Sequence, residues 1–159
     1  MNENNLEKII NNIVGDAIVK EVMSLKLAVK LIETVEEKAA EMGLAVVVAV
    51  SDASGRPIAV HCMDSAYHGS FDVAVNKTYT STAFQMSTAK LSRLCQPGQD
   101  LYGLQFSNNG KVMILGGGEP LMVGKTMIGA LGVSGGSAQE DSDLAAYGAS
   151  ALKEVIKCL

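Results

Sequence analysis

The sequence predicts an α+β domain in which helices pack on an antiparallel sheet. Predicted strands follow one another without an intervening helix at two places, which favours antiparallel neighbours. Helical periodicity appears in separate blocks before, between and after these strands. The chain has 159 residues, of which 48% are apolar, and this suits a single domain with a sizeable core.

The chain is predicted to begin with two helices. The first runs from Leu6 to Val22, with asparagine and charged residues opposite one apolar stripe. The stripe consists of Leu6, Ile9, Ile10, Ile13, Val14, Ala17, Ile18 and Val22. Ser24 is typical of an N-cap for the second helix, Leu25 to Met42, which Gly43 ends. Its inward residues are expected to be Leu27, Ala28, Leu31, Ile32, Val35 and Ala39.

A hairpin and two helices are predicted next. Residues 44–50, LAVVVAV, are rich in β-branched side chains, and a DASGRP turn joins them to a second strand, PIAVHCM. Helical spacing returns from Ser70 to Phe84. Ser87 caps a short helix through Leu94, which Pro97-Gly98 ends.

The last third is predicted to form strands and a final helix. KVMILGGG and KTMIGALGVSGG read as strands, separated by a turn around Glu119-Pro120 and Gly124. Ser137 to Glu140, SAQE, is a capping box that opens the helix. Its inward face is expected to contain Leu144, Tyr147, Ala151, Leu152 and Val155.

Composition argues against several classes of partner. A net charge of −4 with no basic cluster gives nucleic acid little to bind. The start, MNENNLEKII, does not resemble a signal peptide, and no apolar run is long enough to cross a membrane. Cys62, Cys95 and Cys158 are widely spaced, which indicates reduced thiols. These features predict a cytoplasmic protein.

The glycine-rich segment from Leu115 to Asp141 does not match a nucleotide-binding loop. The spacing from Gly118 to Gly124 is too long by one residue for a Walker A motif, and GKT precedes a strand instead of a helix. No first βα turn precedes a Rossmann pattern. The glycines are expected to allow bends and close packing, or the approach of a flat ligand. An anion at Gly135-Gly136 would compete with acidic residues of the following helix.

Several motifs together resemble a known family. They are VVVAVSDASGRPIAV, CMDSA, DVAVNKTYTSTAF, STAKL, QPGQDLYGL, LGGGEPL and IGALGVSGGSAQED. From about Ser24 onward the chain resembles the GlcG/HbpS haem-binding family, in particular the C-terminal domain of PduO-type proteins. The expected organisation is therefore a helix over residues 1–23 and a GlcG/HbpS-like domain over residues 24–159.

The resemblance implies a fold, an assembly and a cofactor. The fold would be profilin-like, with a five-stranded antiparallel sheet flanked by helices, assembled into a homo-oligomer, commonly an octamer. Relatives bind haem, and some degrade it. PduO-type relatives act on corrinoids through an adenosyltransferase domain that this sequence is expected to lack. Haem or a corrinoid is therefore the expected cofactor, and no catalytic residues are assigned.

Candidate site residues come from the helix at Ser70 and from nearby segments. The resemblance associates Asp72, Lys77 and Thr80 with the family pattern of a haem-contacting helix, in which the lysine would pair a propionate and the threonine would approach iron. Lys77 and Thr80 are three residues apart and share a helix face. Gly116, Gly117 and Gly118 would admit the flat ligand. The structural alternative is a solvated lysine and a threonine bonded to its own helix.

Two histidines are further candidates for iron ligands. His61 lies on the second strand, where it could equally face solvent or an interface, and His68 precedes the Ser70 helix. Methionine could also ligate iron, although it more often fills cores; the candidates are Met63, Met86, Met113, Met122 and Met127.

The N-terminal helix resembles the encapsulation peptides that direct enzymes into bacterial microcompartments. Residues 1–22 would then contact a shell protein, and the protein would lie in the microcompartment lumen. The alternative is that the apolar stripe packs on its own domain or oligomer. The leading functional hypothesis is an oligomeric tetrapyrrole-binding accessory protein of a diol-utilisation pathway. Its alternative is a scaffolding protein without such a ligand; no residue pattern supports an enzyme acting on a small diol or aldehyde.

Overall fold

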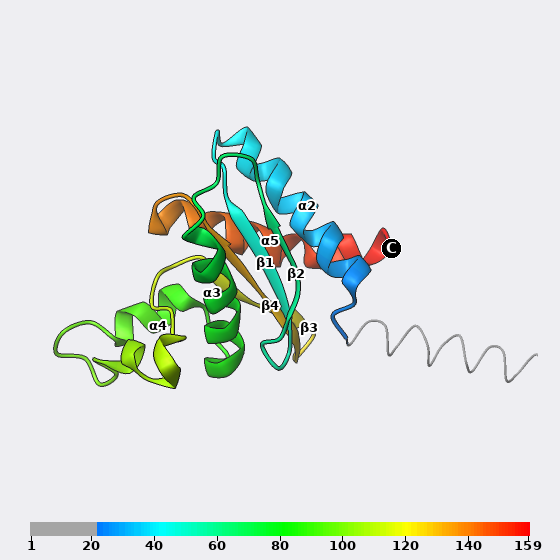
Figure 1. Ribbon diagram of the computed structural model, residues 1–159. Coiled ribbons are helices and arrows are strands. Elements are labelled where there is room, and N and C mark those ends of the chain that lie inside the picture. The colour runs from blue at the N-terminus through cyan, green and yellow to red at the C-terminus, as the bar shows by residue number, and fades with distance from the viewer. Residues whose placement is uncertain (1–21) are drawn as a thin grey trace, which may run out of the picture.

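The computed structural model describes residues 22–159 and shows an α+β fold (Figure 1). Its helices are α2 (Leu25–Glu41), α3 (Ser70–Phe84), α4 (Thr88–Leu94) and α5 (Ala138–Lys157). Its strands are β1 (Val47–Asp52), β2 (Pro57–Cys62), β3 (Gly118–Val123) and β4 (Thr126–Ser134). Two short 3₁₀ turns lie at Leu104–Phe106 and Asn108–Gly110. The predicted helix over Leu6–Val22 lies outside the described residues, save for Val22 itself.

The strands form one antiparallel sheet in the order β2-β1-β4-β3. Helices α2 and α5 pack side by side on one face, and α3 covers the other (Figure 1). The larger core lies between the sheet and the α2/α5 layer, and it includes Leu31, Val48 and Leu144. The predicted fold class is therefore confirmed.

Local signals place the helix ends where the sequence predicts them. The Ser24 hydroxyl accepts a hydrogen bond from the Leu27 N–H, and Gly43 follows α2 with a φ of +71°. All six residues predicted to face inward on α2 are buried. Ser137 and Glu140 form both hydrogen bonds of a capping box.

The sheet contains four strands among the described residues, so the expected fifth strand is wrong. The segment before Gly118 was predicted to be part of a strand, but its backbone donors go elsewhere. The Met113 N–H donates to Thr80 Oγ1 at 2.8 Å, and the Gly118 N–H donates to Thr88 Oγ1 at 2.8 Å. The Met113 N–H is thus satisfied by α3 instead of by a strand. The segment meets β4 only at its end, where the Gly117 carbonyl oxygen accepts from the Val133 N–H at 2.8 Å and β3 begins at Gly118.

Two further expectations near the C-terminus need correction. Glu119-Pro120 do not form a turn; they lie inside β3, and the chain reverses at Gly124, where φ is +60°. Tyr147 is not inward on α5 but 40% exposed, and the Lys38 ammonium lies 5.8 Å from the centre of its ring. No helix between residues 22 and 159 has the length and apolarity needed to cross a membrane.

Candidate functional site

A buried ion pair lies where α3, β4 and α5 meet. The Lys77 side chain is 1% exposed, and its ammonium donates to the Val133 carbonyl oxygen at 2.6 Å and to Asp141 Oδ2 at 2.8 Å. The other oxygen of Asp141 accepts from the Gly136 N–H at 2.9 Å. These contacts join residues that are far apart in sequence, so the pair ties three elements together.

Two opposing effects of its surroundings act on the pKa of the Lys77 ammonium. Burial lowers the pKa of the Lys77 ammonium, while the hydrogen bond and the negative charge of Asp141 act in the opposite direction. The carboxylate that pairs the ammonium is therefore supplied by the chain itself. A haem propionate would have to displace Asp141 to reach this nitrogen.

The glycines at 116–118 pass directly over this pair. A Cβ atom at Gly117 would lie 2.8 Å from Lys77 Nζ and 2.6 Å from the Val133 carbonyl oxygen, and φ there is +109°. At Gly118 it would lie 2.5 Å from Thr88 Cγ2 and 2.9 Å from Ser81 Oγ. Because the protein's own atoms fill this space, the glycines serve close packing in the described chain.

The Thr80 hydroxyl is also engaged within the protein. It donates to the Asn76 carbonyl oxygen at 2.7 Å and accepts from the Met113 N–H at 2.8 Å, and the residue is fully buried. The first bond is the back-bonding expected for a helix threonine, and the second anchors the segment before β3. Binding of iron by this oxygen would compete with both bonds.

His68 and Asp72 lie at the opposite end of α3, on the surface. His68 precedes the Gly69 N-cap, and Asp72 is in the first turn of the helix. Both residues are exposed, and they are flanked by two exposed rings, Tyr67 at 73% and Phe71 at 45%. The start of α3 therefore combines an accessible imidazole with accessible aromatic surface.

His61 is separate from both groups. It lies on the edge strand β2, and its Nδ1 is 3.2 Å from Glu36 Oε1 of α2. The His61 side chain is partly exposed, and Glu36 gives it a hydrogen-bond partner within the protein. Of the candidate methionines, Met122 is 46% exposed. Between residues 22 and 159 no cluster of three or more His, Cys, Asp or Glu side chains is placed to hold a metal ion.

The structure thus gathers some candidates and separates others. Lys77, Thr80 and the glycines at 116–118 form one buried polar layer, whereas His68 with Asp72 and His61 occupy two other places. Sequence reasoning missed Asp141 as the partner of Lys77. The available signal was its position in the first turn of α5, among the acidic residues expected to compete with an anion at Gly135-Gly136. Its bond to Gly136 supports that interpretation.

Comparisons with known proteins place the domain. A family model described as "Haem degrading protein HbpS-like" matches residues 23–150. An uncharacterized 15.0 kDa protein of Citrobacter freundii, from the dhaT-dhaS intergenic region, is 39% identical over 77% of this chain and 87% of its own length. The corrinoid adenosyltransferase PduO of Salmonella typhimurium is 39% identical over 69% of this chain. The chain matches only 32% of that protein's length.

Solved structures give the same result. Protein ORFY of Klebsiella pneumoniae superposes with a TM-score of 0.80 at 36% identity, over 82% of this chain and 90% of its own. A complex of PduOC with haem superposes with a TM-score of 0.78 at 35% identity, over 82% and 94%. A double mutant of HbpS of Streptomyces reticuli superposes with a TM-score of 0.73 at 26% identity, over 82% of this chain and 87% of its own.

Proposed function

The chain belongs to the HbpS-like family, and from this membership we propose that it binds haem at the start of α3. The observation that carries the proposal is the similarity to PduOC, whose structure is a haem complex, at 35% identity over 82% of this chain. The family description points to the same cofactor. Haem would supply iron and macrocycle chemistry, and the protein would supply the ligand and the apolar surface.

His68 is the proposed axial ligand. Imidazole is a common ligand of haem iron, and haem faces pack against apolar or aromatic surface. His68 is exposed between Tyr67 and Phe71, so its ring can reach a ligand without unfolding the helix. Lys77 and Thr80 would first have to break internal hydrogen bonds, and we therefore assign them a supporting role behind this surface.

A homo-oligomer would complete this site. An exposed ligand on one protomer leaves most of a haem in water, whereas a second copy could cover its other face. The exposed rings at Tyr67 and Phe71 are surface of the kind that such contacts bury. We propose that the assembly is a homo-oligomer, with an octamer as the expected size.

Haem titration tests this proposal. Purified protein is titrated with haemin while the Soret band is followed, and His68→Ala is compared with the matched variant His61→Ala. Removing the ligand should weaken binding by more than the roughly 10- to 100-fold loss typical of a supporting residue in a metal site. His61→Ala should bind as the parent does. No saturable Soret shift in the parent, or equal binding by both variants, would contradict the assignment.

A place in diol metabolism is the related cellular proposal. The Citrobacter freundii relative lies between dhaT and dhaS, and other relatives are PduO proteins. These neighbours favour a role beside a diol-utilisation enzyme set, with residues 1–22 contacting a microcompartment shell protein. A cobalamin titration in parallel with haemin tests the corrinoid alternative. Binding of neither tetrapyrrole would favour the scaffolding function instead.

A further inference from the structure

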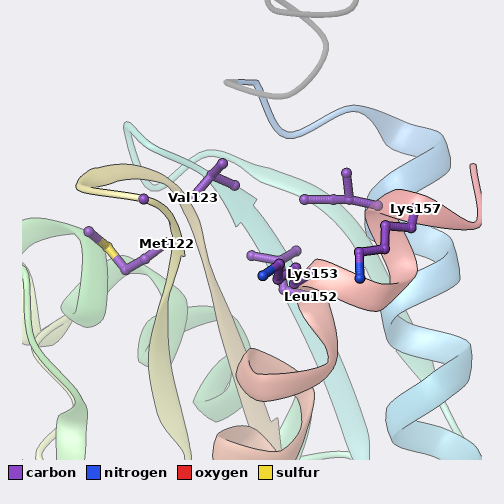
Figure 2. A pocket seen from close by; sticks show the side chains of 7 residues that line it. Met122, Val123, Leu152, Lys153 and Lys157 are labelled. Atoms are coloured by element: carbon purple, nitrogen blue, oxygen red, sulfur yellow. The ribbon is translucent and has the colours of Figure 1, made fainter.

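An apolar groove lies at the end of the molecule where the described chain begins. It lies between the turn after β3, at Met122 and Val123, and the last two turns of α5, and it has a volume of about 370 Å³. From α5 it is lined by Leu152, Lys153, Ile156 and Lys157. Figure 2 shows Val123 on one side of this groove and Leu152, Lys153 and Lys157 on the other. We call it the C-terminal groove.

A second hollow lies beside it, at the start of α2. It has a volume of about 530 Å³ and is lined by Leu25, Val29 and Leu159 together with charged residues of α2. Leu25 is 62% exposed and Leu159 43% exposed. The first hollow is lined by the last two turns of α5 and the second by Leu159, two residues after that helix, so apolar surface is uncovered at both places.

The chain enters the fold at this same end. Met23 is buried in the main core and is 3% exposed, whereas Val22 immediately before it is 54% exposed. The Lys26 ammonium donates to the Leu159 carbonyl oxygen at 3.2 Å, which places the start of α2 beside the C-terminus. Any segment that precedes Val22 therefore starts close to the C-terminal groove.

The segment before Val22 is complementary to the groove in apolar surface and in charge. Its apolar stripe includes Ile9, Ile10 and Ile13, and nothing in its own sequence can cover a stripe of that length. It carries four acidic residues against two lysines, whereas the groove and the adjoining hollow carry four lysines against one glutamate: Lys153, Lys157, Lys26, Lys30 and Glu33. Apolar surface and charge are thus complementary on the two sides.

We propose that the apolar stripe of residues 1–21 docks into the C-terminal groove of its own protomer. The short connection through Val22 and Met23 keeps the segment at high effective concentration beside the groove, which favours its own protomer over a second copy. The stripe cannot lie in the groove and on another protein at once. Docking therefore controls whether residues 1–21 are available to an external partner.

Thiol protection in the full-length chain tests the docking. In a background in which the exposed Cys62 and Cys158 are changed to serine, only the buried Cys95 remains. Ile13→Cys lies on the stripe and Asn12→Cys lies off it. Alkylation of the thiol at position 13 should be about tenfold slower than at position 12, because local opening must precede reaction. Equal rates at the two positions would overturn the proposal.

Variants of the C-terminal groove test whether this groove is the surface that covers the apolar stripe of residues 1–21. Met122→Glu puts a charge into the groove at a residue that is already 46% exposed, so folding is little affected. It should bring the two alkylation rates to within about twofold of each other. The matched change Ala146→Glu, at an exposed α5 residue outside the groove, should leave the protection intact. Protection that survives Met122→Glu would place the stripe on another surface.

Disulfide trapping separates docking in one protomer from docking between copies. Cys158 is exposed one residue beyond Lys157 of the groove. With this cysteine retained and Cys62→Ser, oxidation of Ile10→Cys and Ala17→Cys variants should give an intrachain disulfide in at least one of them. A disulfide only between chains, or none in either variant, counts against docking in one protomer. Haemin binding is measured in parallel, so failure here is distinguishable from failure of the proposed function.

Discussion

The buried pair of Lys77 and Asp141 makes a quantitative prediction about stability. Lys77→Met keeps the length of the side chain but leaves the Asp141 carboxylate, which is 5% exposed, without the cation 2.8 Å away. Removing one partner of a buried ion pair costs about 3–5 kcal/mol, because the remaining charge stays buried and unpaired. The carbonyl oxygen of Val133 also loses its 2.6 Å hydrogen bond from the ammonium. Lys77→Met should therefore lower the free energy of unfolding by this amount.

A double variant shows whether the loss of stability in Lys77→Met comes from the unpaired charge or from altered packing. Replacing both partners by apolar residues, as in Lys77→Met with Asp141→Leu, removes the buried charges together and should recover most of the loss. A deficit of about 2 kcal/mol should remain, because the Gly136 N–H loses its bond to Asp141 and the Val133 carbonyl oxygen loses its bond from Lys77. If the double variant is no more stable than either single variant, the pairing argument is wrong.

The Asp141→Leu variant adds a pH dependence. Burial lowers the pKa of Lys77, and without Asp141 the opposing interaction is gone. The unfolded chain then binds more protons than the folded one between the lowered pKa and the ordinary value of 10.5. The free energy of unfolding of this variant, relative to the parent, should rise as pH increases from the lower pKa of Lys77 in the variant to its higher pKa in the parent. A flat difference between the two would show that the lysine is not buried in the variant.

Urea unfolding followed by circular dichroism measures these values, at one fixed protein concentration because an oligomer gains stability from association. Lys30→Met is the matched control. Lys30 forms a solvent-exposed pair with Glu33 at 3.0 Å, and such pairs contribute little. The control should therefore unfold at the same urea concentration as the parent. A loss below about 1 kcal/mol in Lys77→Met would refute the structural role of the pair.

Three further predictions concern local features. Ser137→Ala removes the N-cap of α5 and should lower the free energy of unfolding by about 1 kcal/mol, whereas Ser150→Ala in the middle of α5 should change it less. Gly132→Ala would push a methyl group onto the α3 backbone at the Ala74 carbonyl oxygen, weaken the contact between α3 and the sheet, and lower the free energy of unfolding by about 1–3 kcal/mol. Its control is Gly43→Ala, where the space is open but φ is +71°, and backbone strain alone should cost about 1–2 kcal/mol. Burial raises the pKa of Glu119, so the parent should lose stability as pH rises from 4.5 through that raised value. Glu119→Gln should remove this loss in thermal melts across pH, and an unchanged pH profile would contradict it.

Much of the fold could be predicted from sequence because its signals are local. The α2 stripe, the Ser24 cap, the bounds of α3 and the capping box of α5 each depend on residues within a few positions. The segment before Gly118 was mispredicted because its composition favours a strand. The Met113 N–H in this segment instead bonds Thr80, 33 residues earlier, and the Gly118 N–H that follows it bonds Thr88, 30 residues earlier. Periodicity contains no information about such partners.

The candidate site illustrates the same limit. Sequence spacing correctly placed Lys77 and Thr80 on one face of α3, but it could not tell which way that face points. In the fold it points at β4 and the glycines at 116–118, and Asp141, 64 residues away, neutralises the lysine. A lysine already paired inside the protein does not attract a propionate from outside. Because α3 turns this polar face inward, we propose that a haem bound by this helix uses its exposed start, where His68, Tyr67 and Phe71 lie. If His68→Ala loses haemin binding with unchanged stability, the start of α3 holds the ligand. The buried pair of Lys77 and Asp141 then supports the helix without contacting haem.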